Sequence, residues 1–289
     1  MNLGIVILNY KTKDITLNLV EECYKMNVFQ YIVVVDNNSN DGIDQEIKRS
    51  SNIFLIKNNN NLGYAKGNND GFRFLAFETD CDYAFLANPD VEFDKEVIIN
   101  IARFLNDNQD FCVASSKRSD SFYGDQALQF WNRPSFLECC LESFYIYRMI
   151  NYRRRRLKSF EVVEKESSNY ITVDVVPGAF FGVNLKKFAQ SGFMDEDTFL
   201  WYEENCLAAK LLALNLKKAL LVNVSYYHNH RSTHHGNSLF YQYNLSKEYY
   251  CRKYLAINLF QMALLNLLDF YSNLEQKILN IIGKHIRRR

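Results

Sequence analysis

The segment Asn88-Pro89-Asp90 ends an apolar run that begins at Phe85. A carboxylate just beyond a buried strand is a ligand that Mg²⁺ and Mn²⁺ prefer. One or two such groups suffice, because the ion keeps waters and binds phosphate oxygens. The same residues also suit a type I turn with Asp90 as a cap. A metal site that holds a diphosphate and a plain turn are therefore both open.

A second acidic site, Glu203-Glu204, lies at the predicted start of a helix. A carboxylate placed there can act as a general base that deprotonates an acceptor hydroxyl. The preceding aromatic residues, Phe199, Trp201 and Tyr202, would shape a pocket that excludes water. Adjacent acids also favour the positive end of a helix, so a purely structural role remains open.

Four of the five histidines cluster in one segment, as His228, His230, His234 and His235. Such clustering raises the question of zinc, but no cysteine lies nearby at ligand spacing. One histidine that contacts a metal-bound diphosphate is a better explanation. Solvated loop histidines are the structural alternative.

The first third of the chain must position these groups, and it alternates between strand and helix patterns. We predict strands at Leu3–Leu8, Tyr31–Asp36, Asn52–Lys57 and Tyr83–Asn88, with helices at Thr12–Met26 and Tyr64–Phe77. This alternation indicates a parallel sheet with helices on both faces. The polar residues that follow each strand should then converge on one crevice at the carboxyl ends of the strands.

Two of these strand ends suit a nucleotide. Asp36 can accept hydrogen bonds from a base or a ribose, and the residues after it let the backbone turn sharply. Gly63 and Gly67 allow close approach near a helix N-terminus, where anions bind. The pattern is neither G-x-G-x-x-G nor a P-loop. Ordinary βα loops are the structural alternative.

The remainder of the chain is less regular. Residues 112–172 are hard to assign, the segment 170–184 alternates as a strand does, and the chain from about Leu239 is predicted to be helical. The basic run Tyr152–Lys158 and the terminal Arg287–Arg289 suit an anionic membrane surface. Ordinary packing of the tail against the core is the favoured interpretation.

Composition narrows the class of protein. The 289 residues carry 34 Lys and Arg against 33 Asp and Glu, so no basic excess indicates nucleic acid. Seven cysteines without a C-x-x-C pair, and a predicted strand immediately after the first residues, indicate a reduced cytoplasmic protein without a signal peptide. We leave open contact with the inner face of the plasma membrane, and formation of a homodimer.

Taken in order, these segments resemble family 2 glycosyltransferases, especially bacterial rhamnosyltransferase-like members. The resemblance runs from Leu3 to about Tyr254 and is carried by IVILNY, VVVDNNSNDG, NNNLGYAKGNNDG, FLANPDVEF, VDVVPGAFFGV and GFMDEDTFLWYEENCLAAKL. It implies an α/β protein of the GT-A fold, with a Rossmann-like, mainly parallel central sheet flanked by helices and a C-terminal helical extension. Residues 1–105 would bind the nucleotide sugar, residues 106–238 would form the acceptor-binding and catalytic half, and residues 239–289 would be a basic helical tail.

The resemblance also implies roles for single residues. The nucleotide sugar would be bound by Asn9, Tyr10, Asp36, Asn38, Gly63, Ala65, Asn69 and Asn88. Asp90 would be the metal ligand of a variant Asp-x-Asp motif, and His228, or else His230, would contact the metal or the diphosphate. Glu203-Glu204 matches a Glu-Asp pair whose second acid is the base.

The chain departs from the family pattern at three positions of this last segment. Glu204 replaces the usual Asp, which places the carboxylate one methylene further out. Cys206 stands where relatives often have a second Asp, and Lys210 replaces a common Arg. These changes indicate an altered choice of acceptor or, as the alternative, a loss of activity.

The implied function is inverting transfer of a sugar, with Mg²⁺ or Mn²⁺ as cofactor. The donor would be dTDP-L-rhamnose or a UDP-sugar, and the acceptor a glycan, such as a lipid-linked intermediate of capsule or O-antigen synthesis. A non-catalytic nucleotide-sugar-binding relative is one alternative. A sugar nucleotidyltransferase is another, but it would not need the acid pair, and its Gly-rich basic loop is missing near the N-terminus.

Overall fold

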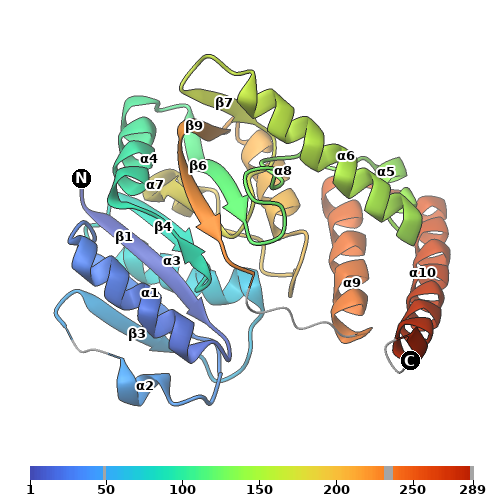
Figure 1. The fold of residues 1–289 in the computed structure, drawn as a ribbon, viewed down its shortest axis with the longest axis horizontal. Coiled ribbons are helices and arrows are strands. Elements are labelled where there is room, and N and C mark those ends of the chain that lie inside the picture. Colours follow the sequence, from blue (N-terminus) through green and yellow to red (C-terminus); the bar gives the residue numbers. More distant parts are fainter. Residues whose placement is uncertain (48–49, 231–236, 287–289) are drawn as a thin grey trace.

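The structure is a computed structural model that describes residues 1–47, 50–230 and 237–286; in the last of these ranges, side chains are described for 240–278. A central sheet is covered by helices on both faces, and four helices form a further layer at one side (Figure 1). The terminal Arg287–Arg289 and the histidines His234 and His235 lie outside the described residues.

The first half of the sheet is parallel, as the sequence predicts. Its strands are β1 (Leu3–Asn9), β2 (Tyr31–Asp36), β3 (Ile53–Lys57) and β4 (Tyr83–Ala87), in the order β3-β2-β1-β4. Asn9 pairs with Asp36 in register, so the ends of β1 and β2 lie side by side. The predicted convergence of these strand ends at one edge is confirmed.

The second half of the sheet is mixed, so the expectation of a mainly parallel sheet holds for the first half only. The order continues from β4 through β8 (Phe180–Asn184), β6 (Phe111–Asp120), β9 (Lys217–His228) and β5 (Val91–Glu92), while β7 (Tyr170–Val173) pairs with β9. β8 runs antiparallel to both β4 and β6, whereas β6 and β9 are parallel. The segment predicted to alternate as one strand, 170–184, forms the separate strands β7 and β8.

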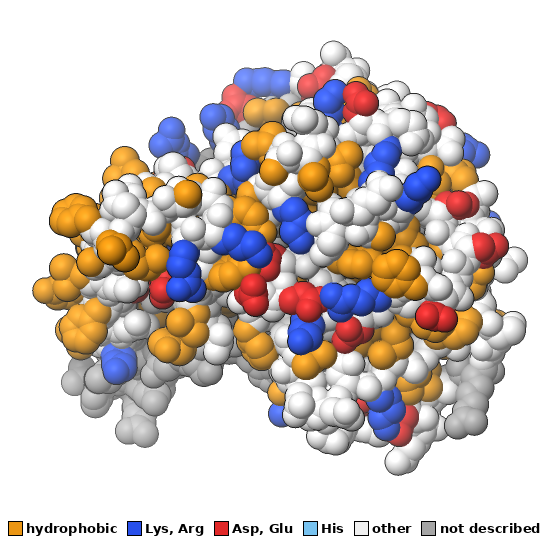
Figure 2. Space-filling view, turned by 180° about the vertical axis from the view of Figure 1, so that it is seen from behind, with side chains coloured by type: hydrophobic (Ala, Val, Ile, Leu, Met, Phe, Trp, Pro, Cys, Tyr) orange, Lys and Arg blue, Asp and Glu red, His pale blue; other side chains and the backbone are white. Residues whose placement is uncertain are grey.

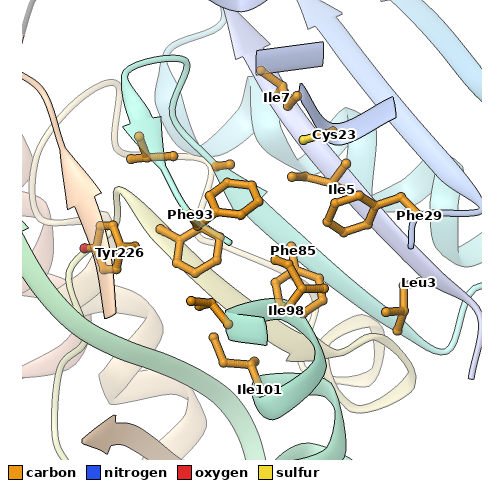
Figure 3. Packing of buried hydrophobic residues seen from close by; sticks show 14 of the residues in the cluster. Leu3, Ile5, Ile7, Cys23, Phe29, Phe85, Phe93, Ile98, Ile101 and Tyr226 are labelled. Atoms are coloured by element: carbon orange, nitrogen blue, oxygen red, sulfur yellow. The ribbon is translucent and has the colours of Figure 1, made fainter. Parts of the chain in front are cut away.

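Helices cover both faces of the sheet, as predicted. One face packs against α1 (Lys13–Met26) and α4 (Lys95–Asp107), and Figure 3 shows Phe85, Phe93 and Ile98 meeting in this core. The other face packs against α3 (Tyr64–Glu78), α7 (Leu185–Gln190) and α8 (Glu203–Ala213). The short helix α2 (Ile43–Glu46) follows β2.

The layer at one side, called the helical layer below, is built from two distant parts of the chain. It comprises α5 (Phe136–Leu141), α6 (Tyr145–Glu164), α9 (Asn237–Tyr254) and α10 (Leu259–Ile286). Inside it, the fully buried Lys247 ammonium pairs with Asp269 at 2.5 Å and donates to Ser143 at 3.0 Å. A buried charge needs such partners, because an unpaired one would be expensive to take out of water. The tail from Leu239 therefore packs on the chain, as expected.

A small core joins this layer to the sheet domain. It contains Tyr202 and Tyr250. It also contains four of the seven cysteines, namely Cys139, Cys140, Cys206 and Cys251. All seven cysteines are free thiols, in agreement with the reduced state that the sequence indicates. The core brings α5 and α9 against the first turn of α8.

Candidate active site

The ends of β1 and β2 form a dense polar network. The buried Asn9 amide donates to Asp36 at 3.2 Å and to Ser39 at 3.0 Å, while its carbonyl accepts from Thr12 and Thr16. Asp36 also accepts from the backbone N–H of Ser39 at 3.1 Å. Asn9 is thus used inside the protein, where it fixes the Asp36 carboxylate, and its predicted contact with the nucleotide would be indirect.

Three other residues predicted to bind the nucleotide sugar lie on the loops that leave this edge or on the helix that follows. Tyr10 follows β1 directly and is partly exposed. Asn38 has a left-handed backbone, with φ 60°, in the turn after β2. Ala65 is fully buried in the first turn of α3. Their role toward the nucleotide sugar stays a prediction.

Gly63 occupies a position that only glycine fits. Its φ of 82° with ψ of −176° is closed to other residues, and an added Cβ would lie 2.4 Å from the backbone oxygen of Phe199. The next N–H, that of Tyr64, donates to the same oxygen at 2.8 Å. The start of α3 is therefore joined directly to the segment that leads into α8.

Asn69 makes a second connection between these regions. Its buried amide donates to the Met194 oxygen and to Glu196, both at 2.9 Å, and its carbonyl accepts from the Met194 N–H. This position is one turn inside α3, away from its N-terminal end. The contacts make Asn69 a structural bridge, and its predicted proximity to the donor is not tested by them.

The Asp90 carboxylate faces His228 across two paired strands. β5 pairs with β9 so that Val91 lies opposite His228, and His228 Nε2 is 3.2 Å from Asp90 Oδ1. The His228 ring is centred 4.0 Å from that of His230. His228 Nδ1 is buried and has no hydrogen-bond partner. The two residues that the resemblance assigns to the metal thus meet, with His230 beside them.

Arg118, at the end of β6, adds a cation to this site. Its Nη2 lies 2.7 Å from Asp120 Oδ2 and 2.8 Å from His230 Nε2, whereas its buried Nε has no partner. Burial lowers the pKa of His230, and the nearby His228 and Arg118 lower it further. His230 is therefore held as a neutral imidazole, and Arg118 supplies the fixed positive charge.

The acid pair lies at the first turn of α8. Glu204 Oε1 accepts from the Gly178 N–H at 3.1 Å, and a Cβ added at Gly178 would come within 2.5 Å of the same oxygen. Glu203 is more deeply buried, and its Oε2 has no partner. Burial raises the pKa of both carboxyls, and for Glu203 the charge of Glu204 raises it further.

A small pocket opens beside the acids. Its walls include Tyr64, Gly178, Met194, Glu203, Glu204 and Lys218. The pocket is largely apolar elsewhere, through residues such as Val176 and Leu207. A carboxyl in such surroundings keeps its proton to higher pH than an exposed glutamic acid.

Tyr64 connects the Asp90 side with the acid side. Its hydroxyl lies 2.8 Å from the side-chain oxygen Oδ1 of Asn88 and 2.7 Å from the backbone oxygen of Gly178. Burial raises the pKa of Tyr64 well above 10, and the charges of Glu203, Glu204 and Asp90 act in the same direction. Tyr64 therefore lies between the turn that carries Asp90 and the acid pair, and the charges of both sides reach it.

Sequence reasoning missed the roles of Tyr64, Arg118 and Gly178. Tyr64 and Gly178 lie inside segments that carry the family resemblance, but neither residue type by itself indicates a bridge between two loops. Arg118 lies in the part of the chain that the sequence left unassigned. A signal was present only for Gly178, as a glycine in a segment that otherwise alternates like a strand.

The residues around Asp90 fit a divalent cation. Among the described residues no group of three or more acids, histidines or cysteines could hold a metal. Asp90 and His228 would therefore supply at most two ligands, with phosphate oxygens and water supplying the rest. This is how Mg²⁺ and Mn²⁺ are commonly held. The unpartnered Nδ1 of His228 and Nε of Arg118 are polar atoms available to a ligand in the same place.

Comparison with known proteins decides the family. Residues 5–167, more than half of the chain, match the family described as Glycosyl transferase family 2. The chain belongs to glycosyl transferase family 2. This family 2 chain is also 24% identical over 224 residues to the low-salt glycan biosynthesis hexosyltransferase Agl10 of Haloferax volcanii, covering 77% of its own length and 66% of that relative.

Solved structures show that the family 2 chain has the GT-A fold. GalNAc-T7 in complex with UDP, GalNAc and Mn²⁺ matches with a TM-score of 0.60 and 12% identity, over 98% of this chain and 57% of that one. The mannosyltransferase PcManGT of Pyrobaculum calidifontis, in complex with GDP-Man and Mn²⁺, matches with a TM-score of 0.59 and 12% identity. The match covers 94% of this chain and 72% of that one. Staphylococcus aureus TarS 1-349 in complex with UDP matches with a TM-score of 0.53 and 14% identity. The match covers 85% of this chain and 64% of that one. The chain thus spans only about two thirds of several proteins that it matches.

Proposed function

We propose that this protein is an inverting glycosyltransferase that uses a divalent cation and a nucleoside diphosphate sugar. The observation that carries the proposal is that Tyr64 bonds both to Asn88, two residues before Asp90, and to Gly178, whose N–H bonds to Glu204, while Asp90 contacts His228. A single displacement needs positive charge on one side of the anomeric carbon and a base on the other. The contacts of Tyr64 on both sides support a site with groups of both kinds.

In the proposed reaction Glu204 takes the proton of an acceptor hydroxyl. That oxygen bonds to the anomeric carbon of the donor sugar while the bond from this carbon to the diphosphate oxygen breaks, and the nucleoside diphosphate leaves with the bonding electrons. The raised pKa of Glu204 brings the carboxylate closer in basicity to the hydroxyl proton that it must accept. Arg118 stabilises the negative charge that grows on the departing diphosphate.

A divalent cation at Asp90 and His228 would supply further positive charge to the diphosphate. Glu203, buried and with a strongly raised pKa, stays protonated beside Glu204. It leaves Glu204 as the only carboxylate of the pair to ionise at neutral pH. Two adjacent acids in one dry pocket would otherwise repel each other.

We further propose that the donor is dTDP-L-rhamnose or a UDP-sugar and that the acceptor is a glycan of a cell-surface polysaccharide, carried on a lipid. The rhamnose assignment is supported by the resemblance of the motif segments. Relatives found in complex with UDP and with GDP-Man support the general class of nucleotide sugar. The cytoplasm would be the site of reaction, where nucleotide sugars are available to such an enzyme.

Contact with a membrane would suit this acceptor, and α10 supports it. Its inward side carries polar groups: Ser272 accepts from Arg148, Asn273 contacts Asn244, and Asp269 pairs within the layer. Its outward side carries exposed apolar residues, including Phe260 at 79% and Phe270 at 66% exposure, followed by Leu264, Leu267, Tyr271, Leu274 and Ile278. Figure 2 shows these hydrophobic side chains gathered along the edge that α10 forms, on the left of that view.

An ordinary surface helix turns its apolar side inward, whereas α10 carries apolar residues on its outward side as well as inward, where Leu265 is fully buried. A helix with an outward apolar face suits the interface of a bilayer, and neither acid among the described side chains of α10 is exposed. Exposed Arg153, Arg154 and Lys277 favour anionic headgroups. No helix in the described part of the chain is both long and apolar enough to cross a membrane.

A donor screen tests the proposed function. Nucleotide sugars, including dTDP-L-rhamnose, UDP-sugars and GDP-mannose, are added to the full chain with and without Mn²⁺, and thermal unfolding is measured. We expect one donor to raise the melting temperature only with the metal, because a ligand that binds the folded state stabilises it. The selected donor is then incubated with glycan acceptors. Metal-dependent binding without turnover on any acceptor would favour a non-catalytic sugar-binding protein instead.

Vesicle sedimentation tests the membrane contact. Vesicles of phosphatidylcholine with and without phosphatidylglycerol are mixed with the wild-type chain and with F260E/F270E. We expect the wild type to sediment with the anionic vesicles and the variant to remain in solution. If light scattering instead shows a dimer that the same double substitution dissociates, a second copy of the chain covers this face.

A further inference from the structure

Two residues immediately before the acid pair have an unusual backbone. Trp201 and Tyr202 both lie in the left-handed region, with φ 73° and 65°. Neither is glycine, so the turn costs free energy and persists only where its surroundings hold it. Tyr202 is also the residue that precedes the first helical position of α8, which is Glu203. Its conformation therefore sets the direction in which both acids leave the helix start.

The side chain of Tyr202 is anchored in the helical layer. Its hydroxyl donates to Glu142 Oε2 at 2.6 Å, and both residues are buried, with 4% and 6% exposure. Arg155 Nη1 lies 3.1 Å from the other oxygen of the same carboxylate. Hydrogen bonds to an ionised acceptor are among the stronger ones, and burial keeps water from replacing them. The contact is therefore a firm tie between α8 and the helical layer.

The turn has two further ties, and both are made through backbone oxygens. Ser246 of α9 donates to the Leu200 oxygen at 2.9 Å, and the Tyr64 N–H donates to the Phe199 oxygen. These contacts hold the first half of the turn. The last residue of the turn is Tyr202, one position before the acids, and it is anchored through its own side chain.

We propose that Tyr202 is a positioning residue for the acid pair. Its hydrogen bond to Glu142 holds the left-handed turn closed, and the closed turn keeps the Glu204 carboxylate against the Gly178 N–H. The helical layer thereby sets the geometry of the base without contributing a group to the reaction. This inference rests on the proposed function where it concerns catalysis, and on the structure alone where it concerns the turn.

The chain offers a matched control in Tyr243. Its hydroxyl donates to the same Glu142 oxygen at 2.8 Å, from α9 rather than from the turn. The rings of Tyr202 and Tyr243 are centred 5.4 Å apart, in the same environment. Tyr202→Phe and Tyr243→Phe therefore remove the same kind of hydrogen bond from the same carboxylate. Only the first removes a tie to the acids.

The first measurement is steady-state transfer by both variants with the donor that the screen selects. We expect Tyr202→Phe to lower kcat about tenfold with little change in the donor KM, because a shifted base slows the chemical step and leaves donor binding intact. Tyr243→Phe should keep kcat within about twofold, a range typical of a purely structural contact. Urea unfolding checks that both variants fold and lose similar stability.

The second measurement does not need activity. Amide hydrogen exchange is followed in peptides that cover residues 199–206, where the Cys206 N–H bonds to the Tyr202 oxygen. We expect exchange there to become at least about tenfold faster in Tyr202→Phe and to stay unchanged in Tyr243→Phe, because local opening exposes these amides. Equal effects of the two variants on kcat or on exchange would overturn the proposal. A wild-type chain that transfers no sugar would refute the proposed function, while the exchange result would still decide the role of Tyr202.

Discussion

The donor side and the acid side of the candidate site are held in different ways. On the donor side, Asn9 and Asp36 lie at adjacent ends of paired strands, so the sheet itself brings them together. On the acid side, Glu204 follows a strained turn whose anchors come from α3, from Glu142 just after α5, and from α9. The first arrangement needs only local chain order, whereas the second needs the whole molecule to be folded. Substitutions that weaken the distant helices should therefore shift the acid pair and leave the Asn9–Asp36 contacts unchanged.

The largest effect that would sharpen this contrast is expected at the proposed base. Glu204→Gln should lower kcat by about a thousandfold, a loss typical of removing a general base. Donor binding, measured by thermal shift with Mn²⁺, should remain close to wild type, because the proposed role of Glu204 is toward the acceptor. Substantial turnover by the variant would show that another group takes the proton.

Asp90→Asn should show the opposite pattern. We expect the Mn²⁺-dependent thermal shift by the donor to disappear and kcat/KM to fall about a hundredfold, as charge that stabilises the leaving group is lost. Titration of Mn²⁺ against the donor-bound protein measures this directly. A variant whose metal dependence matches the wild type would mean that Asp90 is not a ligand.

Gly178→Ala tests how closely the two sides are fitted together. The new Cβ would meet Glu204 Oε1 at 2.5 Å, so the carboxylate must move. We expect kcat to fall about tenfold or more, since small misplacements of a catalytic group are costly. We also expect a loss of about 1–3 kcal/mol in the free energy of unfolding, typical of overpacking. Unchanged kcat with reduced stability would separate Gly178 from the position of the base.

The smallest expected effect concerns Glu203, and it appears as a dependence of stability on pH. The pKa of Glu203 is raised in the folded protein, first by burial and then by the charge of Glu204. Between the unfolded pKa, about 4.3, and the raised folded pKa, the folded state holds a proton that the unfolded state has lost. Stability should therefore fall as pH rises through this window.

Glu203→Gln replaces the ionisable carboxyl with a neutral amide, so it abolishes this fall in stability with rising pH. We expect the variant to match the wild type below pH 4 and to be more stable than the wild type at pH 8, because Gln has no proton to lose as the pH rises. Urea unfolding at the two pH values measures the difference. A variant that is less stable at both would show that the Glu203 carboxyl makes a favourable contact that the structure lacks.

The donor side was largely predictable from the sequence, and the acid side was not. Alternating apolar strands and the polar residues after them indicate a parallel sheet and its binding edge, because both signals are local. The pair Asp90 and His228 was joined by family resemblance, and the structure brings the two residues together. Their roles toward a metal or a nucleotide stay predictions.

Three features were beyond sequence reasoning for a common physical reason. The antiparallel insertion of β8, the bond between Tyr64 and Gly178 and the tie between Tyr202 and Glu142 all join residues at least 60 positions apart. No periodicity or turn signal encodes such partners. The left-handed turn at Trp201 and Tyr202 is harder still, because the residue types there do not favour it and tertiary contacts impose it.

The four thiols buried between α8 and the helical layer have a practical consequence. Cys139, Cys140, Cys206 and Cys251 line the contact through which the layer reaches the acid turn. A maleimide reagent can modify them only when the layer separates from the sheet domain. The rate at which these four thiols are alkylated in native buffer would therefore report how often the layer separates, without any introduced cysteine.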